Sequence, residues 1–273
     1  MPHDSFTLGS LEVVPLCDGW APLPLTEEMP GHEVDWDEER TRFPWAFPPE
    51  DPSSWAWHVH SFLVRHPAGL VLIDTGIGDF GRPPYDVSSA IDEELDAVGV
   101  SPGDVSHVVL THLHADHSGG TCLPDGSPRF PNARHHVHPD DWSFFGEQRT
   151  PDDFTGRFAM ASLEELGMLD LDASDHEVLR GVRLRHAPGH TPGHRVVLLD
   201  DGNDTLLLTG DLLHVPPQIA FPAQLSNHDE DPEVAARQRA DLIEAALMKG
   251  WALGVSHFAR PFGRVGPDGW TSV

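Results

Sequence analysis

The sequence predicts an α+β fold in two successive halves, each of which combines strands with helices. Short apolar runs rich in β-branched residues, such as 105–110, are typical of buried strands. Stretches with apolar residues three and four positions apart predict helices. Hydrophobic residues make up 39% of the 273 residues, and no Ser/Gly-rich linker divides the chain. We therefore expect residues 1–273 to form a single domain.

The first half begins with strands and continues with helices. Residues 88–98 are expected to form a helix, because Ile91, Leu95 and Val98 recur at helical spacing. The predicted strands of this half are 11–16, 59–64, 70–73, 105–110 and 134–137, and its predicted helices are 88–98, 140–148 and 152–166.

The second half repeats this style with three strands followed by a long helix. Near 232–249, Arg and Asp residues separate apolar residues, which predicts a helix with one apolar face. A short apolar stretch, 251–255, then leads to Ser256 and His257. The predicted strands are 182–186, 195–199 and 205–208, and the apolar residues of the predicted helix are Val234, Leu242, Ile243, Ala246 and Leu247.

The most informative motif is the run from His112 to His117, which contains three histidines and one aspartate. If the chain stays extended after the preceding strand, His112 and His114 point the same way. The glycine-rich turn expected just downstream would bring Asp116 and His117 round to face them. Imidazole nitrogens and carboxylate oxygens are suitable ligands for a first-row divalent metal. The alternative is a polar surface loop that is rich in histidine.

Three later segments argue against that alternative. His190 lies between two Pro-Gly turns, Asp211 follows a predicted strand and a glycine, and His257 follows the last apolar stretch. Each residue thus comes just after an apolar stretch or a turn, where loops on a rigid scaffold carry chemistry. Together with the first motif, they favour a metal site.

These motifs, in this order, resemble those of the metallo-β-lactamase superfamily of hydrolases. Its hallmarks are His-x-His-x-Asp-His, a histidine in a Pro-Gly-His turn, a Gly-Asp and a final histidine, and all occur here. An upstream Asp-Thr-Gly of the family matches the sequence that begins at Asp74, an aspartate that supports the metal site without binding metal. The resemblance covers about 62–265. It implies an αββα sandwich of four layers, in which two mixed sheets pack face to face with helices outside.

The resemblance also implies seven ligands for two divalent metal ions, and every position carries the expected residue type. Zinc is the first expectation, and manganese, iron or cobalt would suit the same nitrogen and oxygen ligands. The two ions would activate a bridging hydroxide for attack on a carbonyl or phosphoryl centre. Asp116 would also orient the hydroxide and pass a proton to the leaving group. The first ion would bind His112, His114 and His190, the second would bind Asp116, His117 and His257, and Asp211 would bridge both.

The implied substrate is a lactone or another apolar ester. The alternatives are an organophosphate triesterase or arylesterase, and further a thioesterase or a metal-binding protein without turnover. In the homoserine-lactone lactonases of the superfamily, a tyrosine lies at the position of His214, whereas the only tyrosine here is Tyr85. We expect His214 to act as a donor in place of that tyrosine. A histidine with a packing role is the alternative.

Composition restricts the partners. The formal net charge is −27, and Lys249 is the only lysine. Such a surface repels nucleic-acid phosphate and anionic membranes, so neither is expected as a partner. No apolar run approaches the length of a membrane span, and the first residues do not resemble a signal peptide. The two cysteines, Cys17 and Cys122, suggest no disulfide framework. We expect a cytoplasmic enzyme.

Residues 21–57, here called the aromatic segment, carry little periodicity. A long loop is usually functional or disordered, and the aromatic content argues against disorder. One hypothesis is a wall beside the metals that accepts an apolar acyl or aryl group. The other is a strap that buries its rings on the sandwich or in a homodimer contact. The rings belong to Trp36, Phe43, Trp45, Phe47, Trp55 and Trp57.

The histidines outside these motifs are expected to have other roles. His194 is expected to pack or to form hydrogen bonds around the site without binding metal. His58 and His60 alternate along a predicted strand, so they either face the site or belong to the scaffold. The three histidines between residues 135 and 138 are expected to be structural or exposed, and a weak metal-binding or tautomer-fixing role is the alternative.

Overall fold

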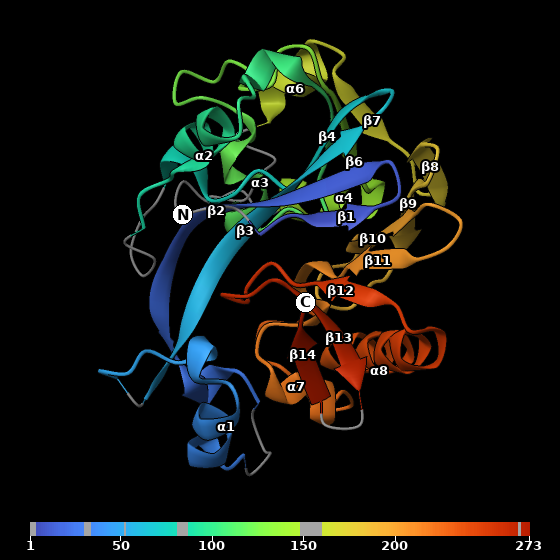
Figure 1. The fold of residues 1–273 in the computed structure, drawn as a ribbon. Coiled ribbons are helices and arrows are strands. Elements are labelled where there is room, and N and C mark those ends of the chain that lie inside the picture. The colour runs from blue at the N-terminus through green and yellow to red at the C-terminus, as the bar shows by residue number, and fades with distance from the viewer. Residues whose placement is uncertain (1–3, 30–33, 52, 81–86, 148–159, 267–268) are drawn as a thin grey trace.

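Two mixed seven-stranded sheets pack face to face in the computed structural model, with helices on the outer faces (Figure 1). The structure describes residues 4–29, 34–51, 53–80, 87–147, 160–266 and 269–273. In each sheet, the strands lie side by side in the order of the sequence. The αββα sandwich that the resemblance implies is therefore confirmed.

The first sheet has an antiparallel part and a parallel part. Its strands are β1 (Phe6–Leu8), β2 (Leu11–Pro24), β3 (Ser54–His66), β4 (Gly69–Ile73), β5 (Val105–Val109), β6 (Arg134–Val137) and β7 (Leu169–Leu171). Strands β2 and β3 form a long antiparallel ribbon, whereas β4 to β7 are all parallel. The carboxyl ends of parallel strands meet at one edge of the sheet, so the loop after β5 opens at that edge.

The second sheet is antiparallel except for one pair. Its strands are β8 (His176–Leu179), β9 (Val182–His186), β10 (Arg195–Asp200), β11 (Thr205–Leu208), β12 (Ala252–Gly254), β13 (Phe262–Gly266) and β14 (Gly269–Ser272). Strands β11 and β12 are parallel. Residues that follow these two strands therefore emerge on the same side of the sheet.

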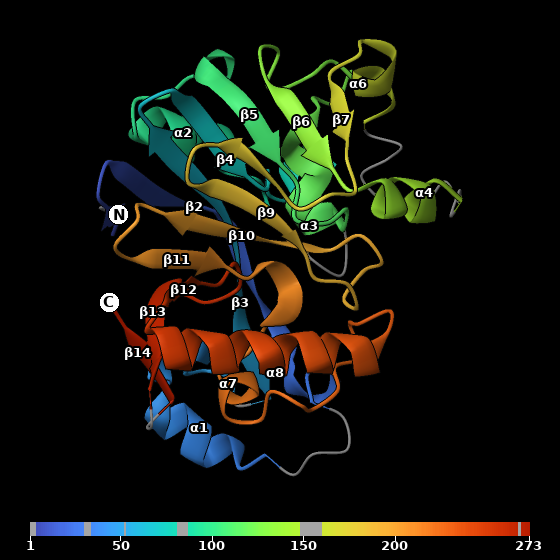
Figure 2. The same ribbon diagram turned by 90° about the vertical axis from the view of Figure 1, so that its right-hand side faces the viewer.

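Three apolar clusters hold the layers together. One lies between the sheets and joins residues such as Phe62 and Val71 to Leu184 and Val197. A second packs the helices of the first half on the first sheet, and a third packs α8 on the second sheet (Figure 2). The helices are α1 (Trp36–Arg42), α2 (Ile91–Ala97), α3 (Ala115–Ser118), α4 (Pro139–Glu147), α6 (Ala161–Glu165), α7 (Pro217–Ala220) and α8 (Pro232–Lys249).

Several predicted elements have the predicted bounds, namely β6, β9, β11 and α8. The helix predicted at 88–98 is shorter, and of the helix predicted at 152–166 only α6 lies within the described residues. Short strands such as β7 and β14 were not predicted, because an alternation of apolar and polar residues cannot be recognised over three or four residues. Among the described helices, none combines the length and the apolar character needed to cross a membrane.

The aromatic segment is more regular than a loop. Its first residues continue β2 to Pro24 and its last residues begin β3 at Ser54, so the strands predicted at 11–16 and 59–64 are both longer than expected. The prolines of β2 are the reason that the longer strand was not predicted. They lie after residues 11–13, which pair with β1, and proline is tolerated at the edge of a sheet. The segment packs on the third cluster, where Phe43, Phe47, Trp55 and Trp57 are buried.

Helix α8 corrects one detail of the predicted apolar face. Leu247 was expected to face the core, but it is 51% exposed. Arg239 was expected among the polar positions, yet its side chain is fully buried. Ala235 and Ile243 lie four residues before and after Arg239 and are buried as well, so Arg239 belongs to the packed face of the helix.

Candidate metal centre

Four of the seven predicted ligands come from the loop that follows β5. His114 still has extended backbone, and α3 begins at the next residue. The rings of His112 and His114 meet edge to face, with centroids 4.8 Å apart. Asp116 and His117 lie within the single turn of α3, which directs them toward these histidines. The extended backbone at His114 agrees with the prediction, whereas the helical turn α3, and not the glycine-rich turn downstream, brings Asp116 and His117 to the cluster.

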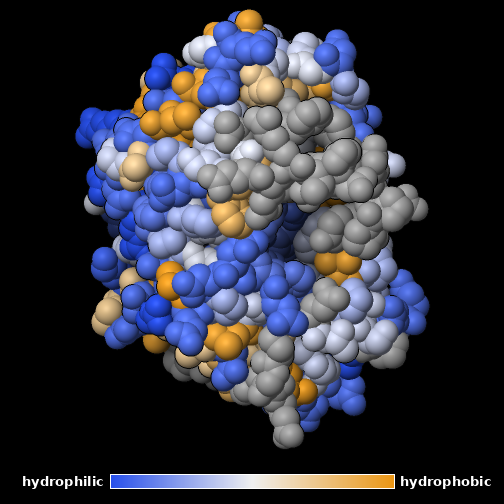
Figure 3. Space-filling model, turned by 180° about the vertical axis from the view of Figure 1, so that it is seen from behind, coloured by the Kyte–Doolittle hydropathy of each residue, from blue (hydrophilic) through white to orange (hydrophobic). Residues whose placement is uncertain are grey.

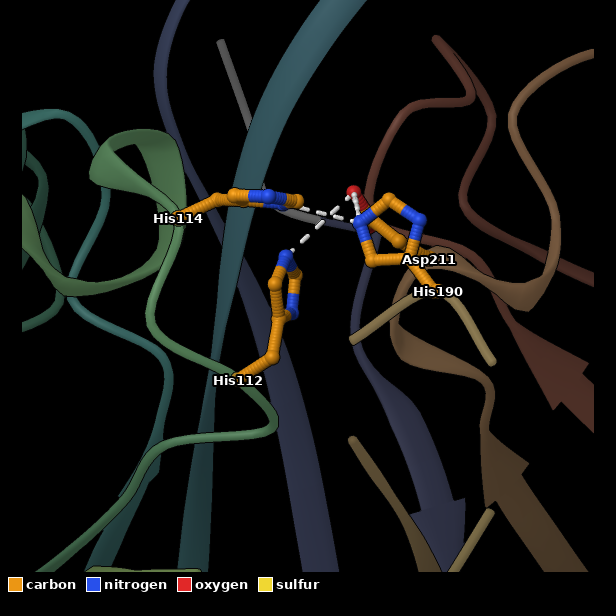
Figure 4. A group of neighbouring side chains, drawn as sticks. All are labelled: His112, His114, His190 and Asp211. Atoms are coloured by element: carbon orange, nitrogen blue, oxygen red, sulfur yellow. Dashed lines mark hydrogen bonds and ion pairs between the residues drawn. The ribbon is translucent and has the colours of Figure 1, made fainter. Parts of the chain in front are cut away.

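The other three predicted ligands come from the second half. His190 lies in the turn between β9 and β10, Asp211 in the short turn after β11, and His257 just after β12. Figure 4 shows the loop of His112 and His114 facing His190 and Asp211 across the centre. Both halves thus contribute to one cluster, and its seven residues are called the Asp211 centre below.

The first group of side chains in this centre is formed by His112, His114 and His190. The Nε2 atoms of His112 and His190 lie 3.7 and 3.4 Å from Asp211 Oδ2. His114 Nδ1 lies 2.9 Å from His190 Nε2. One possible ligand atom of each residue, Asp211 included, lies within 4.8 Å of the others. Such a group can surround one cation.

The second group is formed by Asp116, His117 and His257. His117 Nε2 lies 3.0 Å from Asp211 Oδ1, and His257 Nε2 lies 3.1 Å from each carboxylate oxygen of Asp211. Asp116 Oδ2 lies 3.3 Å from His117 Nε2 and 3.7 Å from His257 Nε2. The ligand atoms of this group and Asp211 again lie within 4.8 Å of one another. Asp211 is therefore the residue shared by both groups.

Several buried polar atoms of the centre make no hydrogen bond among the described residues. They include His112 Nε2, His117 Nε2 and Asp211 Oδ1. A buried donor or acceptor without a partner costs about 1–3 kcal/mol. All three atoms face the middle of the cluster, where imidazole nitrogens and carboxylate oxygens form a donor set that divalent transition metals prefer. The residues present therefore fit bound divalent cations.

The first group is electrically neutral. Burial lowers the pKa of His112 and of His190 well below the ordinary value, because desolvation disfavours the charged ring. Burial likewise lowers the pKa of His114 to about 4. Neutral imidazole is the form that binds a metal.

The second group is richer in negative charge. Burial opposes protonation of His117, but the carboxylates of Asp211, Asp116 and Asp74 outweigh it and raise the pKa of His117 well above the ordinary value. Burial also opposes protonation of His257, but nearby carboxylates, chiefly Asp211, raise the pKa of His257. These carboxylates favour a positive charge at this position, whether a proton or a metal ion supplies it.

Asp74 holds His117 from outside the cluster, as the resemblance implies. His117 Nδ1 donates to Asp74 Oδ2 over 2.8 Å, so its Nε2 points to the centre. The backbone N–H and the hydroxyl of Thr111 both donate to Asp74 and fix the carboxylate. Asp74 has a φ of 59°, a left-handed conformation that aspartate and asparagine tolerate better than most residues.

Asp229 and Arg239 orient His190 from outside the cluster, as Asp74 and Thr111 orient His117. Neither Asp229 nor Arg239 was predicted from the sequence. His190 Nδ1 donates to Asp229 Oδ1 over 3.1 Å, and Arg239 pairs with Asp229 Oδ2 over 3.1 Å. The side chains of the ion pair are fully buried. A charged residue on the packed face of a helix needs a partner, so the position of Arg239 within α8 was a usable signal.

Asp141, at the start of α4, ties the two ligand loops together. It accepts hydrogen bonds from the backbone N–H of Leu113, between two ligands of the first half. It also accepts from the hydroxyl of Thr191 and the N–H of Gly193, next to His190 in the second half. Burial raises the pKa of Asp141 to about 6. No sequence pattern pointed to this residue.

His257 is held by the backbone of β3. Its Nδ1 donates to the carbonyl oxygen of His58 over 2.7 Å, which directs Nε2 to Asp211. Two rings of the aromatic segment lie beside it, with the centroids of Trp57 and Trp55 5.6 and 6.3 Å from that of His257. The aromatic segment therefore reaches the Asp211 centre through β3.

His214 lies at the centre. Its Nε2 is 3.4 Å from Asp211 Oδ2, and its ring stacks on His257 with centroids 5.5 Å apart and planes 12° apart. His194 supports the bridging residue, because the backbone N–H of Asp211 donates to its Nε2 over 3.0 Å. His194 thus has the supporting role expected from the sequence. The three histidines between 135 and 138 are buried and belong to neither ligand group.

A family model described as the metallo-beta-lactamase superfamily matches residues 55–257. Among curated proteins, the N-acyl homoserine lactonase AttM of Agrobacterium fabrum is 32% identical over 177 residues, which cover 56% of this chain and 64% of that protein. An N-acyl homoserine lactonase of a Bacillus species is 24% identical over 208 residues, which cover 70% of this chain and 77% of that protein. The match to the AttM protein thus spans just under two thirds of its length.

Solved structures with the same fold cover almost the entire chain. The hydrolase AbOPH of the beta-lactamase superfamily has a TM-score of 0.83 at 22% identity, with 99% of this chain and 97% of that chain covered. AidC, described as a dizinc quorum-quenching lactonase, has a TM-score of 0.84 at 22% identity, with 99% and 96% covered. At this level of identity the likeness concerns the fold.

Proposed function

Because the chain belongs to the metallo-beta-lactamase superfamily, we propose that it is a metal-dependent hydrolase that opens a lactone or another apolar ester. The observation that carries the proposal is the convergence of two ligand groups on one carboxylate, Asp211. Neither group lacks a ligand-type side chain. A protein that had kept the fold and lost turnover would more often have lost ligands.

Two divalent ions would be held in this centre. His112, His114 and His190 would bind the first, Asp116, His117 and His257 the second, and Asp211 both. Zinc suits the nitrogen and oxygen donors, and manganese, iron or cobalt would suit them as well. When bound, two such ions would make a water molecule acidic near neutral pH and would polarise the carbonyl oxygen of an ester.

The chain's own residues would position substrate and move protons. The Asp116 side chain is 17% exposed, whereas those of His117 and Asp211 are 1% and 4% exposed. Asp116 is thus the carboxylate of the centre best placed to take a proton from water and pass it to the leaving alcohol. His214 Nε2 would donate a hydrogen bond to the substrate oxygen.

The surroundings of the centre favour a neutral substrate with an apolar part. Trp55 and Trp57 lie beside His257, and Trp45 packs on the next residue, Phe258, with centroids 5.4 Å apart. The face opposite to the view of Figure 1 is hollowed at the level where the two halves meet (Figure 3). The net charge of −27 disfavours anionic substrates. The relatives named N-acyl homoserine lactonases make a lactone the first choice.

The test is a hydrolysis panel on the metal-saturated protein. The panel contains N-acyl homoserine lactones of several chain lengths, simple lactones, aryl esters, neutral phosphotriesters and thioesters. Lactones should give the highest kcat/KM, and activity should disappear on chelation and in Asp211→Ala. A preference for phosphotriesters or aryl esters would instead assign the alternative hydrolase activities. A metal-saturated protein that hydrolyses none of these compounds would overturn the proposal in favour of a metal-binding protein without turnover.

A further inference from the structure

A second cluster of metal-ligand side chains lies on the ribbon of β2 and β3. Cys17 in β2 is paired with His60 in β3, and His58 lies two residues before His60. Alternate residues of a strand share a face, so His58 and His60 point to the same side. A bulge between Cys17 and Gly19 shifts the register beside this pair. The two strands thereby bring a thiol and two imidazoles together.

The spacing of these groups suits one small cation. Cys17 Sγ lies 3.6 Å from His58 Nδ1, and one ligand atom of each of the three residues lies within 4.8 Å of the others. In a tetrahedral zinc site, bonds of about 2.3 Å to sulfur and about 2.0–2.1 Å to nitrogen place these atoms about 3.5 Å apart. The distance from Cys17 to His58 is therefore the separation that such an ion would impose.

His60 has the outer hydrogen bond that is typical of a metal-binding histidine. Its Nδ1 donates to the carbonyl oxygen of Ser256 over 2.9 Å. This contact fixes the neutral tautomer with its lone pair on Nε2. His257 in the Asp211 centre is held in the same manner by the carbonyl oxygen of His58. Both hydrogen bonds connect β3 to the residues that follow β12.

The charge around Cys17 favours a cation. The carboxylates of Glu94 and Asp18 lie near the thiol and favour a positive charge beside it. Together with burial, which opposes ionisation of the thiol, they raise its pKa to about 11. Cys17 and His58 are both only partly buried, which gives an ion from solvent a path to them.

We propose that Cys17, His58 and His60 bind a divalent cation of the zinc type at a site that shares no residue with the Asp211 centre. The three side chains leave one position of a tetrahedral ion for water. Binding displaces the thiol proton to solvent. The thiolate gives the site a preference for softer ions such as zinc, cobalt and cadmium over magnesium and calcium. The Asp211 centre, with nitrogen and oxygen ligands alone, has no such sulfur ligand.

Cobalt titration of the full chain tests the site, because thiolate bound to Co²⁺ gives charge-transfer absorption in the near ultraviolet. Wild-type protein should develop this band, and Cys17→Ser should lack it. Cys122→Ser is the matched control, since Cys122 is the other cysteine and is buried on the far cluster, beside Ser162. The control should keep the band. Asp211→Ala should keep it as well, which separates this site from the Asp211 centre.

Two further measurements guard against a variant that does not fold. His58→Gln retains the thiol and should lower the cobalt affinity reported by the band by at least about tenfold. The ring of Trp20 stacks on His58 with centroids 6.0 Å apart, so Co²⁺ bound by wild-type protein should quench its fluorescence. Absence of the band in wild-type protein, its persistence in folded Cys17→Ser, or its loss in folded Cys122→Ser would each overturn the proposal.

Discussion

The two ligand groups that meet at Asp211 differ in charge. The first consists of three imidazoles that burial keeps neutral, and Asp211 supplies its only carboxylate. The second contains Asp116 as well as Asp211, and it lies in front of Asp74. A cation in the second position would therefore face more negative charge. We expect the second position to fill first when metal is added to the metal-free protein.

The groups also differ in how they are supported. His190 of the first group is oriented by Asp229, whose charge is compensated by a fully buried arginine. His117 of the second group is oriented by Asp74, which is held by hydrogen bonds from Thr111. One shared carboxylate thus joins two ligand groups that different aspartates support, and we expect the metal affinities of the two positions to depend separately on Asp229 and Asp74.

The largest effect is expected for Asp211→Ala, which removes the shared ligand. Elemental analysis after metal saturation, with Cys17→Ser in both proteins to remove the further site proposed above, should find two ions per chain when Asp211 is present and at least one fewer in Asp211→Ala, and ester hydrolysis should fall to background. Without Asp211, no ligand shared by both positions offsets the repulsion between the two cations. A wild-type protein that holds a single ion at saturation would contradict the comparison between two positions.

The next effect concerns His214, which approaches Asp211 Oδ2 and stacks on His257. If it donates to the substrate, His214→Ala should lower kcat by roughly ten- to ten-thousand-fold. Metal content should not change, because His214 is in neither ligand group. His214→Tyr keeps a donor and should recover part of the activity. Normal turnover of the alanine variant would assign the residue to packing.

A matched pair of variants tests whether the two positions are tuned separately. Asp229→Asn should weaken metal binding in the first position by about 10–100-fold, and Asp74→Asn should do the same in the second. Asparagine tolerates the left-handed backbone of Asp74. Competition with a chromophoric chelator gives the stepwise affinities. If both variants weakened the same step, the positions would not be independent.

Asp229→Asn carries a cost in stability that must be measured alongside. It leaves Arg239 buried without its ionic partner, which should lower the free energy of unfolding by about 3–5 kcal/mol. Urea denaturation monitored by circular dichroism will show whether the variant is folded under the conditions of the metal titration.

The smallest effect is expected in the aromatic segment, on the side of the second group. Trp45 packs on Phe258, next to His257. Trp45→Ala should raise KM for long-chain or aryl substrates by about tenfold, equivalent to roughly 1.4 kcal/mol. Values for small esters should change less. Trp36→Ala is the control, since its ring contacts Phe47 within the segment. Equal changes in KM for all substrates would indicate that Trp45 has a structural role and does not contact the substrate.

Local patterns determined the strands next to the site and the motif itself. Strand β11 has its predicted bounds because a short continuous apolar run is typical of a buried strand, and α8 has them because its apolar residues recur at helical spacing between Asp231 and Gly250. The run from His112 to His117 defines its own geometry, since its residues lie within one loop and one helical turn. Such features depend on neighbours in sequence, so a sequence reveals them.

Other features were decided only by tertiary contacts. Residues 12–24 form a strand despite their prolines because they pair with β3, and proline is tolerated at the edge of a sheet. Arg239 is buried because Asp229, ten residues earlier, folds back to meet it behind His190. Cys17 in β2 meets His58 in β3, which lies 41 residues later in the sequence.

The sequence by itself determined which side chains could bind metal, because ligand chemistry belongs to the residue type. The motifs, through the family resemblance, also indicated which histidines would gather at Asp211 and that Asp74 would support them, whereas only the tertiary structure decided that Asp229 and Asp141 lie behind the ligand loops. The physical reason is the range of the forces. The periodicity of a helix or strand and the geometry of a turn depend on residues that are close in sequence. Side-chain hydrogen bonds and desolvation depend on which residues the fold brings together, however far apart they are in sequence.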